Sequence, residues 1–270
     1  MINIIKVELY RIKKSVLFWV MFGLSAAIPL LDILLTLVVS AIAGDVSGGM
    51  LDMLGLDVTS SLLQQMTTVA SDAMLLSLIT SAVVLSREFA DGTMRNVMLA
   101  NKSRAQLYFS YLFTALIVAA TYLSVFFLTS LLFGATIFGF GSLSAGDIIS
   151  ACLCSFALGL LAVMFVQTCV CMFLFSVRKQ WATILFPLLI CIFVPSIVQS
   201  ILIIVEMVLT MQGKVMQTGA LRWIPFINMS QYNPANIDGV IVGMNILYMS
   251  VFTAVFVVSG YFTFKKADLK

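Results

Sequence analysis

Six long apolar runs alternate with short polar stretches along the 270 residues of the chain. The runs cover about 16–42, 67–86, 108–134, 148–176, 182–205 and 241–264. A helix needs about 20 residues to cross roughly 30 Å of hydrocarbon, and every run reaches that length. Because hydrocarbon offers no partner for an unpaired backbone N–H or C=O group, all six runs are expected to be helices. The pattern predicts an all-α integral membrane protein with a single transmembrane domain over 1–270.

The segment 1–15 has a different pattern. Ile5, Leu9 and Ile12 recur at spacings of four and three, which places them on one face of a helix. The basic residues fall mostly on the other faces; they are Lys6, Arg11, Lys13 and Lys14. This pattern predicts an amphipathic elbow helix that lies in the membrane interface ahead of the first span. The alternative is a plain basic flank that only sets the topology.

Composition agrees with a membrane protein. Hydrophobic residues make up 61% of the chain and charged residues 10%, whereas soluble domains average about 45–50% apolar residues. The chain has no His, and its five Cys lie inside apolar runs without a CxxC pair, which argues against a zinc site or a disulfide framework. No metal is expected. Nucleic acid is not an expected partner either, because the basic residues border the spans and form no separate domain.

The distribution of positive charge predicts the orientation. Thirteen of the fifteen Lys and Arg residues fall in four short stretches. These are Lys6–Lys14, Arg87–Arg104, Arg178–Lys179 and Lys265–Lys270. A basic stretch at the chain start, after every second run and at the chain end predicts that both termini are cytosolic. The segments 43–66, 135–147 and 206–240 then face outward, and the expected location is a bacterial-type plasma membrane, crossed several times.

The first predicted cytosolic loop, 87–107, has strong local signals. Asp91-Gly92 is a turn signal that can end the helix of the second span. Thr93 can cap a short helix that runs to about Leu99. Ser103, followed three residues later by Gln, forms a capping box for the third span. The loop is therefore predicted to be compact: helix, turn, short helix, turn, helix.

The run EFADGTMRNVMLANKSR, residues 88–104, resembles the Glu…Gly-Thr-x-Arg…Leu…Ser-Arg signature of type-2 ABC exporter permeases. The start of the chain, IKVELYR at 5–11, is similar to the basic amphipathic elbow of such subunits. The end, FKKADL at 264–269, is similar to their aromatic-basic-Asp-Leu close. The resemblance covers the whole chain in topology and is specific in the loop. It implies a six-span permease subunit, the lantibiotic-immunity and peptide-export kinds included.

By this resemblance, the loop 87–107 would couple the spans to an ATPase. The residues that would carry this role are Glu88, Asp91, Gly92, Thr93, Arg95 and Arg104. The elbow, with its four basic residues, would lie near the same partner. The alternative is that these charges merely set the topology and cap helices.

The resemblance also implies partners and cofactors. The chain contains no G-x-x-x-x-G-K-[ST] phosphate loop, so it is not expected to be an enzyme, and a separate P-loop ATPase would bind ATP and Mg. ATPases of this kind act as pairs, which implies two ATPase copies and a second permease, identical or related. Surrounding lipid is the remaining partner.

Two carboxylates, Asp32 and Asp72, lie within predicted spans. An intramembrane carboxylate is costly and points to function. Both are expected in the outer half of the bilayer, where they would line a hydrated outer vestibule, and a proton relay is the alternative. Gln167 and Gln199 are expected to form hydrogen bonds between spans, which are worth about 0.6–2 kcal/mol.

Two other features concern the fifth span and the segment that follows it. Pro187 and Pro195 are expected to bend the fifth span, since each removes a backbone donor. The aromatic and Pro residues of 206–240 indicate a structured cap or re-entrant helices, with an ordinary loop as the equal alternative.

The expected function is to move a hydrophobic or amphipathic cargo, peptide or drug-like, outward with energy from a separate ATPase. A secondary transporter would need ionisable groups near the midplane. An intramembrane enzyme would need Asp32 and Asp72 to form a dyad. A non-catalytic scaffold subunit is the third alternative. Cargo identity and the choice between homodimer and heterodimer stay open at this point.

Overall fold

The computed structural model describes most of the chain. The described residues are 2–43, 61–92, 94, 97, 103–138, 145–194, 196–198, 200–201, 204–205 and 239–266. The predicted outer segment 206–240, except its last two residues, lies outside this set, as do Pro195 and Gln199.

Helices make up the whole of the regular structure in this part of the chain, which has no strand. They are α1 (Ile2–Lys14), α2 (Val16–Ala43), α4 (Ser61–Ala90), α6 (Arg104–Phe138), α7 (Ala145–Val177), α8 (Gln180–Leu188), the π-helical turn η1 (Leu189–Phe193) and α11 (Gly239–Lys266). Among the described residues, six helices are long and apolar enough to cross a membrane, the number that the six apolar runs predict. Several helices extend past the predicted runs, so the loop predicted at 87–107 begins inside α4 and ends inside α6.

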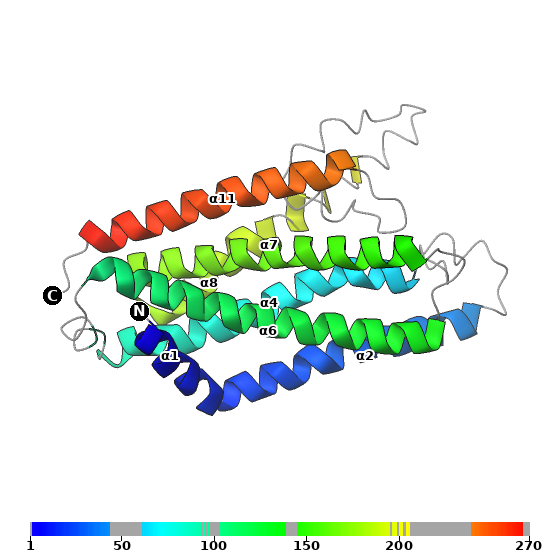
Figure 1. Ribbon diagram of the computed structural model, residues 1–270, viewed down its shortest axis with the longest axis horizontal. Helices are drawn as coiled ribbons and strands as arrows, with labels where there is room; N and C mark the ends of the chain where they lie inside the picture. The colour runs from blue at the N-terminus through cyan, green and yellow to red at the C-terminus, as the bar shows by residue number, and fades with distance from the viewer. Residues whose placement is uncertain are drawn as a thin grey trace.

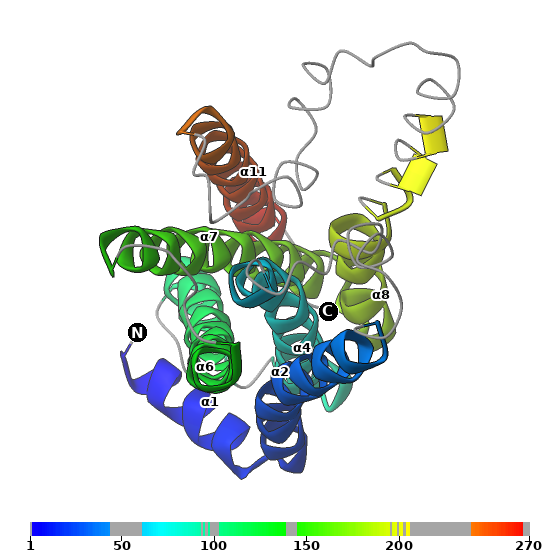
Figure 2. The same cartoon turned by 90° about the vertical axis from the view of Figure 1, so that its right-hand side faces the viewer.

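The helices α4, α6 and α7 form the centre of the bundle, as Figure 2 shows when viewed along its length. In the most apolar stretch of α4, 67% of the residues are buried, against 17% in α2 and 11% in α11. Figure 1 places α1 and the last turn of α11 at the same end of the bundle. We call this end, where α4 also finishes and α6 begins, the basic end.

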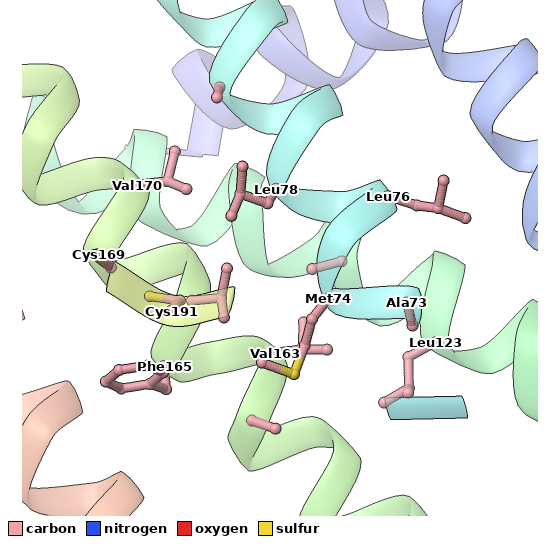
Figure 3. Packing of buried hydrophobic residues seen from close by; sticks show 14 of the residues in the cluster. Ala73, Met74, Leu76, Leu78, Leu123, Val163, Phe165, Cys169, Val170 and Cys191 are labelled. Carbon is pink, nitrogen blue, oxygen red and sulfur yellow. The ribbon is translucent and has the colours of Figure 1, made fainter. Parts of the chain in front are cut away.

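One core cluster joins α4, α6 and α7 with the π-helical turn. Figure 3 shows Met74 and Leu78 of α4 near Val163 and Val170 of α7, with Cys191 of η1 on the same side. The helices α4, α6 and α7 therefore bury apolar side chains against one another. Most apolar side chains of α2 and α11 stay exposed, where lipid or another subunit can contact them.

The side chain of Gln167 joins α7 to α4 by hydrogen bonds inside this core. Its Nε2 donates to Ser77 Oγ at 2.9 Å, and Ser81 Oγ donates to its Oε1 at 2.6 Å. Because Ser77 and Ser81 are four residues apart, both hydroxyls lie on the same face of α4. This confirms the expected hydrogen bonding of Gln167 between spans.

The fifth span departs from regular α-helix near its first proline. Pro187 lies in α8, and the turn that follows, η1, is π-helical. A proline removes one backbone donor, and π-helical turns are one of the usual irregularities of such helices. The helix is therefore irregular directly after Pro187, and the bend expected there stays a prediction.

Candidate functional site

The second span ends in a tight turn at the basic end. The N–H of Asp91 donates to Arg87 O at 2.8 Å, and the N–H of Gly92 donates to Phe89 O at 3.4 Å. Gly92 has φ +67°, a left-handed conformation that glycine adopts at little cost after a helix. Asp91 and Gly92 are both exposed. The turn predicted at Asp91-Gly92 is confirmed.

The third span begins with the predicted cap. Ser103 Oγ accepts a hydrogen bond from the backbone N–H of Gln106 at 3.3 Å, and α6 starts at Arg104. Of the short helix expected between the two turns, Met94 and Val97 are described and are helical. Thr93 and Arg95 lie outside the described residues.

A cluster of three charged residues joins α1 to the end of α4. Arg11 Nη1 donates to Glu8 Oε1 at 3.2 Å and also to Glu88 Oε1, 77 residues further along the chain. Glu8 and Glu88 are both 3% exposed. Both carboxylates are therefore inside the protein, and Glu88 positions α1 against α4. Asp91 and Gly92, in the turn that follows, are exposed instead.

The protonation of Glu8 follows from this setting. Burial is the largest influence and the nearby Glu88 carboxylate the next, and together they raise the pKa of Glu8 from 4.5 to about 7, although Arg11 acts in the opposite direction. A folded-state pKa above the unfolded value means that the folded protein holds the proton more tightly. Glu8 therefore stabilises the fold most below its unfolded pKa, and this contribution is lost as the pH rises through the folded value.

We expect the melting temperature to fall by several degrees as the pH rises from about 5 to about 8. The reason is that Glu8 must ionise inside the protein. Thermal unfolding in nanodiscs of wild type and Glu8→Gln, measured over this pH range, checks the expectation. The Glu8→Gln variant should have a clearly shallower pH dependence, and an identical dependence in the two proteins would contradict the assignment to Glu8.

Arg104 joins the start of α6 to the end of α11. Its Nη1 donates to Lys265 O at 2.9 Å and to Phe264 O at 3.4 Å. A positive side chain at the last carbonyls of a helix satisfies unpaired acceptors and complements the helix dipole. Arg104, which the sequence placed in the coupling loop, thus also fixes the C-terminal helix.

An aromatic cluster packs at the same end of the bundle. It consists of Phe89, Tyr108, Tyr111, Phe175 and Phe264, contributed by α4, α6, α7 and α11. The Phe175 ring is central, with the Phe264 ring centroid at 4.4 Å and the Tyr108 centroid at 5.3 Å. Buried Met94 reaches the cluster from the loop, because Tyr111 Oη donates to its sulfur at 3.8 Å. Through Met94, the loop therefore contacts a cluster to which four helices contribute.

The remaining basic residues of α1 do not join the charged cluster. Lys6 and Lys13 are exposed. The Lys14 ammonium lies 4.8 Å from the Tyr10 ring centroid. Trp19 Nε1 donates to Lys13 O at 2.9 Å and so fixes the corner between α1 and α2. These contacts hold α1 at an angle to α2, as Figure 1 shows.

The intramembrane carboxylates lie away from the basic end. Asp32 and Asp72 are half-buried on α2 and α4. Within the described ranges, no group of three His, Cys, Asp or Glu residues could hold a metal ion. The role of these two residues as an outer vestibule stays a prediction.

Sequence reasoning found both ends of the loop and singled out Glu88 and Arg104, but it missed the other residues that hold the loop in place. Glu8 carried no signal beyond its place among basic residues. Phe175, Tyr108 and Tyr111 are aromatic residues near the ends of apolar runs, a pattern that lipid-facing residues share. Arg11 and Glu88 were both singled out, in separate segments.

The model of the family described as "ABC-2 family transporter protein" matches residues 4–195, from α1 to just past η1. No curated protein and no solved structure matches the chain. The match includes the charged cluster, the turn at Asp91-Gly92 and the start of α6. The membrane chains of this family are non-catalytic permease subunits that work with an ABC ATPase. This chain, a multi-pass membrane protein, belongs to the ABC-2 family of transporter proteins as a permease subunit.

Proposed function

We propose that the chain is the permease subunit of an ATP-driven exporter that moves a hydrophobic or amphipathic cargo, peptide or drug-like, outward. A separate pair of ABC ATPase subunits would bind ATP and Mg and supply the energy. A second permease, identical or related, would complete the complex. The observation that carries this proposal is the double anchoring of the loop between α4 and α6, through Glu88 to α1 and through Arg104 to α11.

The anchoring supports transmission of force from the loop into the spans. Asp91 and Gly92 are exposed where a partner can push, and Thr93 and Arg95 follow directly in the sequence. The Arg11–Glu88 pair and the aromatic cluster hold the ends of the loop against the helices. Coupling between distant sites travels through contiguous packed groups of this kind. A push on the turn would therefore move α1, α4, α6 and α11 together.

Helices at the periphery of the bundle support a route for cargo. The helices α2, α8 and α11 have many exposed apolar side chains, which suit lipid, a second permease or an apolar cargo. Asp32 and Asp72 would form a hydrated vestibule near the exit. Pro187 and the π-helical turn give α8 a place to bend while cargo passes.

The orientation and the partner can be tested with two single-cysteine variants. We expect Asp91→Cys to react with a membrane-impermeant maleimide only from the cytosolic side, and Gly239→Cys, at the start of α11, only from outside. Both positions are exposed, and the five native cysteines, all half-buried or buried, provide the background reading.

Adding the ABC ATPase should protect Asp91→Cys from labelling and leave Gly239→Cys unchanged. Labelling of Asp91→Cys from outside, or an ATPase that binds without protecting it, would contradict the proposed coupling role of the turn.

A further inference from the structure

A small basic pocket lies between α1 and the last turns of α4. Its volume is about 250 Å³, and it is lined by Tyr10, Arg11, Lys14, Ser15, Val84 and Arg87. Three of these six side chains are positively charged. Arg11 belongs both to the pocket and to the Glu8–Arg11–Glu88 cluster, but Glu8 and Glu88 do not line the pocket.

The hydroxyl of Ser15 is the observation that points to a ligand. Ser15 is only 9% exposed, it lines the pocket, and its Oγ has no hydrogen-bond partner among the described residues. Buried hydroxyl groups nearly always have a partner, because leaving one unsatisfied carries the full cost of removing it from water. An acceptor oxygen placed in the pocket would complete the hydrogen bonding of Ser15.

The balance of charge favours an anion. Arg11 already shares its charge with the Glu8 and Glu88 carboxylates. Lys14 lies over the Tyr10 ring and Arg87 is exposed, and neither forms an ion pair with another described residue. Two positive charges therefore remain available to a ligand in the pocket.

The level of the pocket in the membrane identifies the class of anion. Ser15 directly precedes the first membrane span, Val16–Leu35, and Arg87 lies near the end of the second, Asp72–Ala90. Nearby Trp19 is 54% exposed, as expected of an anchor at the interface. The boundary between apolar spans and basic residues is where lipid phosphate groups lie, and basic pockets between spans are typical headgroup sites.

We propose that this pocket binds the phosphate group of an anionic membrane lipid. Ser15 Oγ donates a hydrogen bond to a phosphate oxygen, and Lys14 and Arg87 supply the opposing charge. The bound headgroup bridges α1 and α4 next to the Arg11–Glu88 pair and so stabilises the corner between α1 and α2. Free phosphate presents the same chemistry, and the experiment separates the two sources.

The test measures lipid retention on the full-length protein by native mass spectrometry from detergent. Phosphatidylglycerol, phosphatidylcholine and inorganic phosphate are the three probes. We expect the protein to retain phosphatidylglycerol over phosphatidylcholine, and Lys14→Gln or Arg87→Gln to weaken this preference by about fivefold each, since a basic residue near an anionic headgroup contributes about 1 kcal/mol. Ser15→Ala should weaken it several-fold.

Lys13→Gln is the matched control, because it removes the same charge from the adjacent position outside the pocket. It should leave the preference unchanged, and the lipid-free melting temperature of each variant reports whether it is folded. Equal losses for Lys13→Gln and Lys14→Gln would show diffuse attraction and overturn the proposal. If the wild-type protein retained inorganic phosphate and Ser15→Ala did not, the pocket would be a phosphate site whose ligand comes from solution and not from lipid. If Ser15→Ala, Lys14→Gln and Arg87→Gln all kept the full preference for phosphatidylglycerol, the proposal would be overturned.

Discussion

Replacing Arg11 with Gln is expected to lower the free energy of unfolding by about 2–3 kcal/mol. Arg11 forms ion pairs with both Glu8 and Glu88. At a pH above the pKa of Glu8, its removal leaves two buried carboxylates facing each other without the opposite charge between them. Breaking a buried pair costs about 3–5 kcal/mol, and the value is reduced here because the Arg11 side chain is 39% exposed.

The partners of Arg11 give the comparison that tests this account. Glu88→Gln keeps the Glu8–Arg11 pair, so it should cost only about 1 kcal/mol. The double variant Arg11→Gln/Glu88→Gln should be more stable than Arg11→Gln alone, because it no longer holds two facing carboxylates. Thermal unfolding in nanodiscs measures all three, with exposed Lys6→Gln on the same helix as the control. A larger loss for Glu88→Gln than for Arg11→Gln would show that repulsion between the carboxylates is not the dominant effect.

The spans and the helix ends of this chain were predictable because their signals are local. A run of about 20 apolar residues has one solution in a bilayer. The turn at Gly92 and the cap at Ser103 depend on residues within a few positions of each other, and the structure has both. The same holds for Gln167, whose burial in an apolar run left few alternatives to a hydrogen bond between helices.

The contacts of the basic end were not predictable, because they depend on how the helices pack. Arg11 and Glu88 are 77 residues apart, and Arg104 and Lys265 are 161 apart. Their sequence neighbourhoods fit a partner-facing surface equally well. Only the packing of α1 on the end of α4 turns Glu88 inward, and a single sequence does not encode that angle in any local pattern. The coupling role assigned to these residues is therefore a proposal about positioning as much as about contact.

Adding one methyl group at Gly260 is expected to disturb the basic end strongly. A Cβ atom there would lie 2.6 Å from Tyr108 Oη and 3.1 Å from the backbone Cα of Met172. Neither neighbour can move easily, since Tyr108 is fully buried in the aromatic cluster and Met172 belongs to α7. Gly260→Ala should therefore push α11 away from α7 and cost about 1–3 kcal/mol, the usual cost of overpacking.

Two further variants make the Gly260 prediction specific. Gly243→Ala, in the same helix, is the matched control: an added Cβ meets nothing within 4 Å, so it should stabilise α11 by about 0.5–1 kcal/mol through helix propensity alone. Tyr108→Phe removes the hydroxyl that the new methyl group would strike. That hydroxyl has no hydrogen-bond partner among the described residues, so the substitution should be neutral or stabilising by itself and should restore part of the stability of Gly260→Ala. Melting temperatures in nanodiscs decide the matter: if Gly260→Ala is as stable as Gly243→Ala, or if Tyr108→Phe brings no recovery, then α11 does not pack on Tyr108 and Met172 as closely as the structure has it.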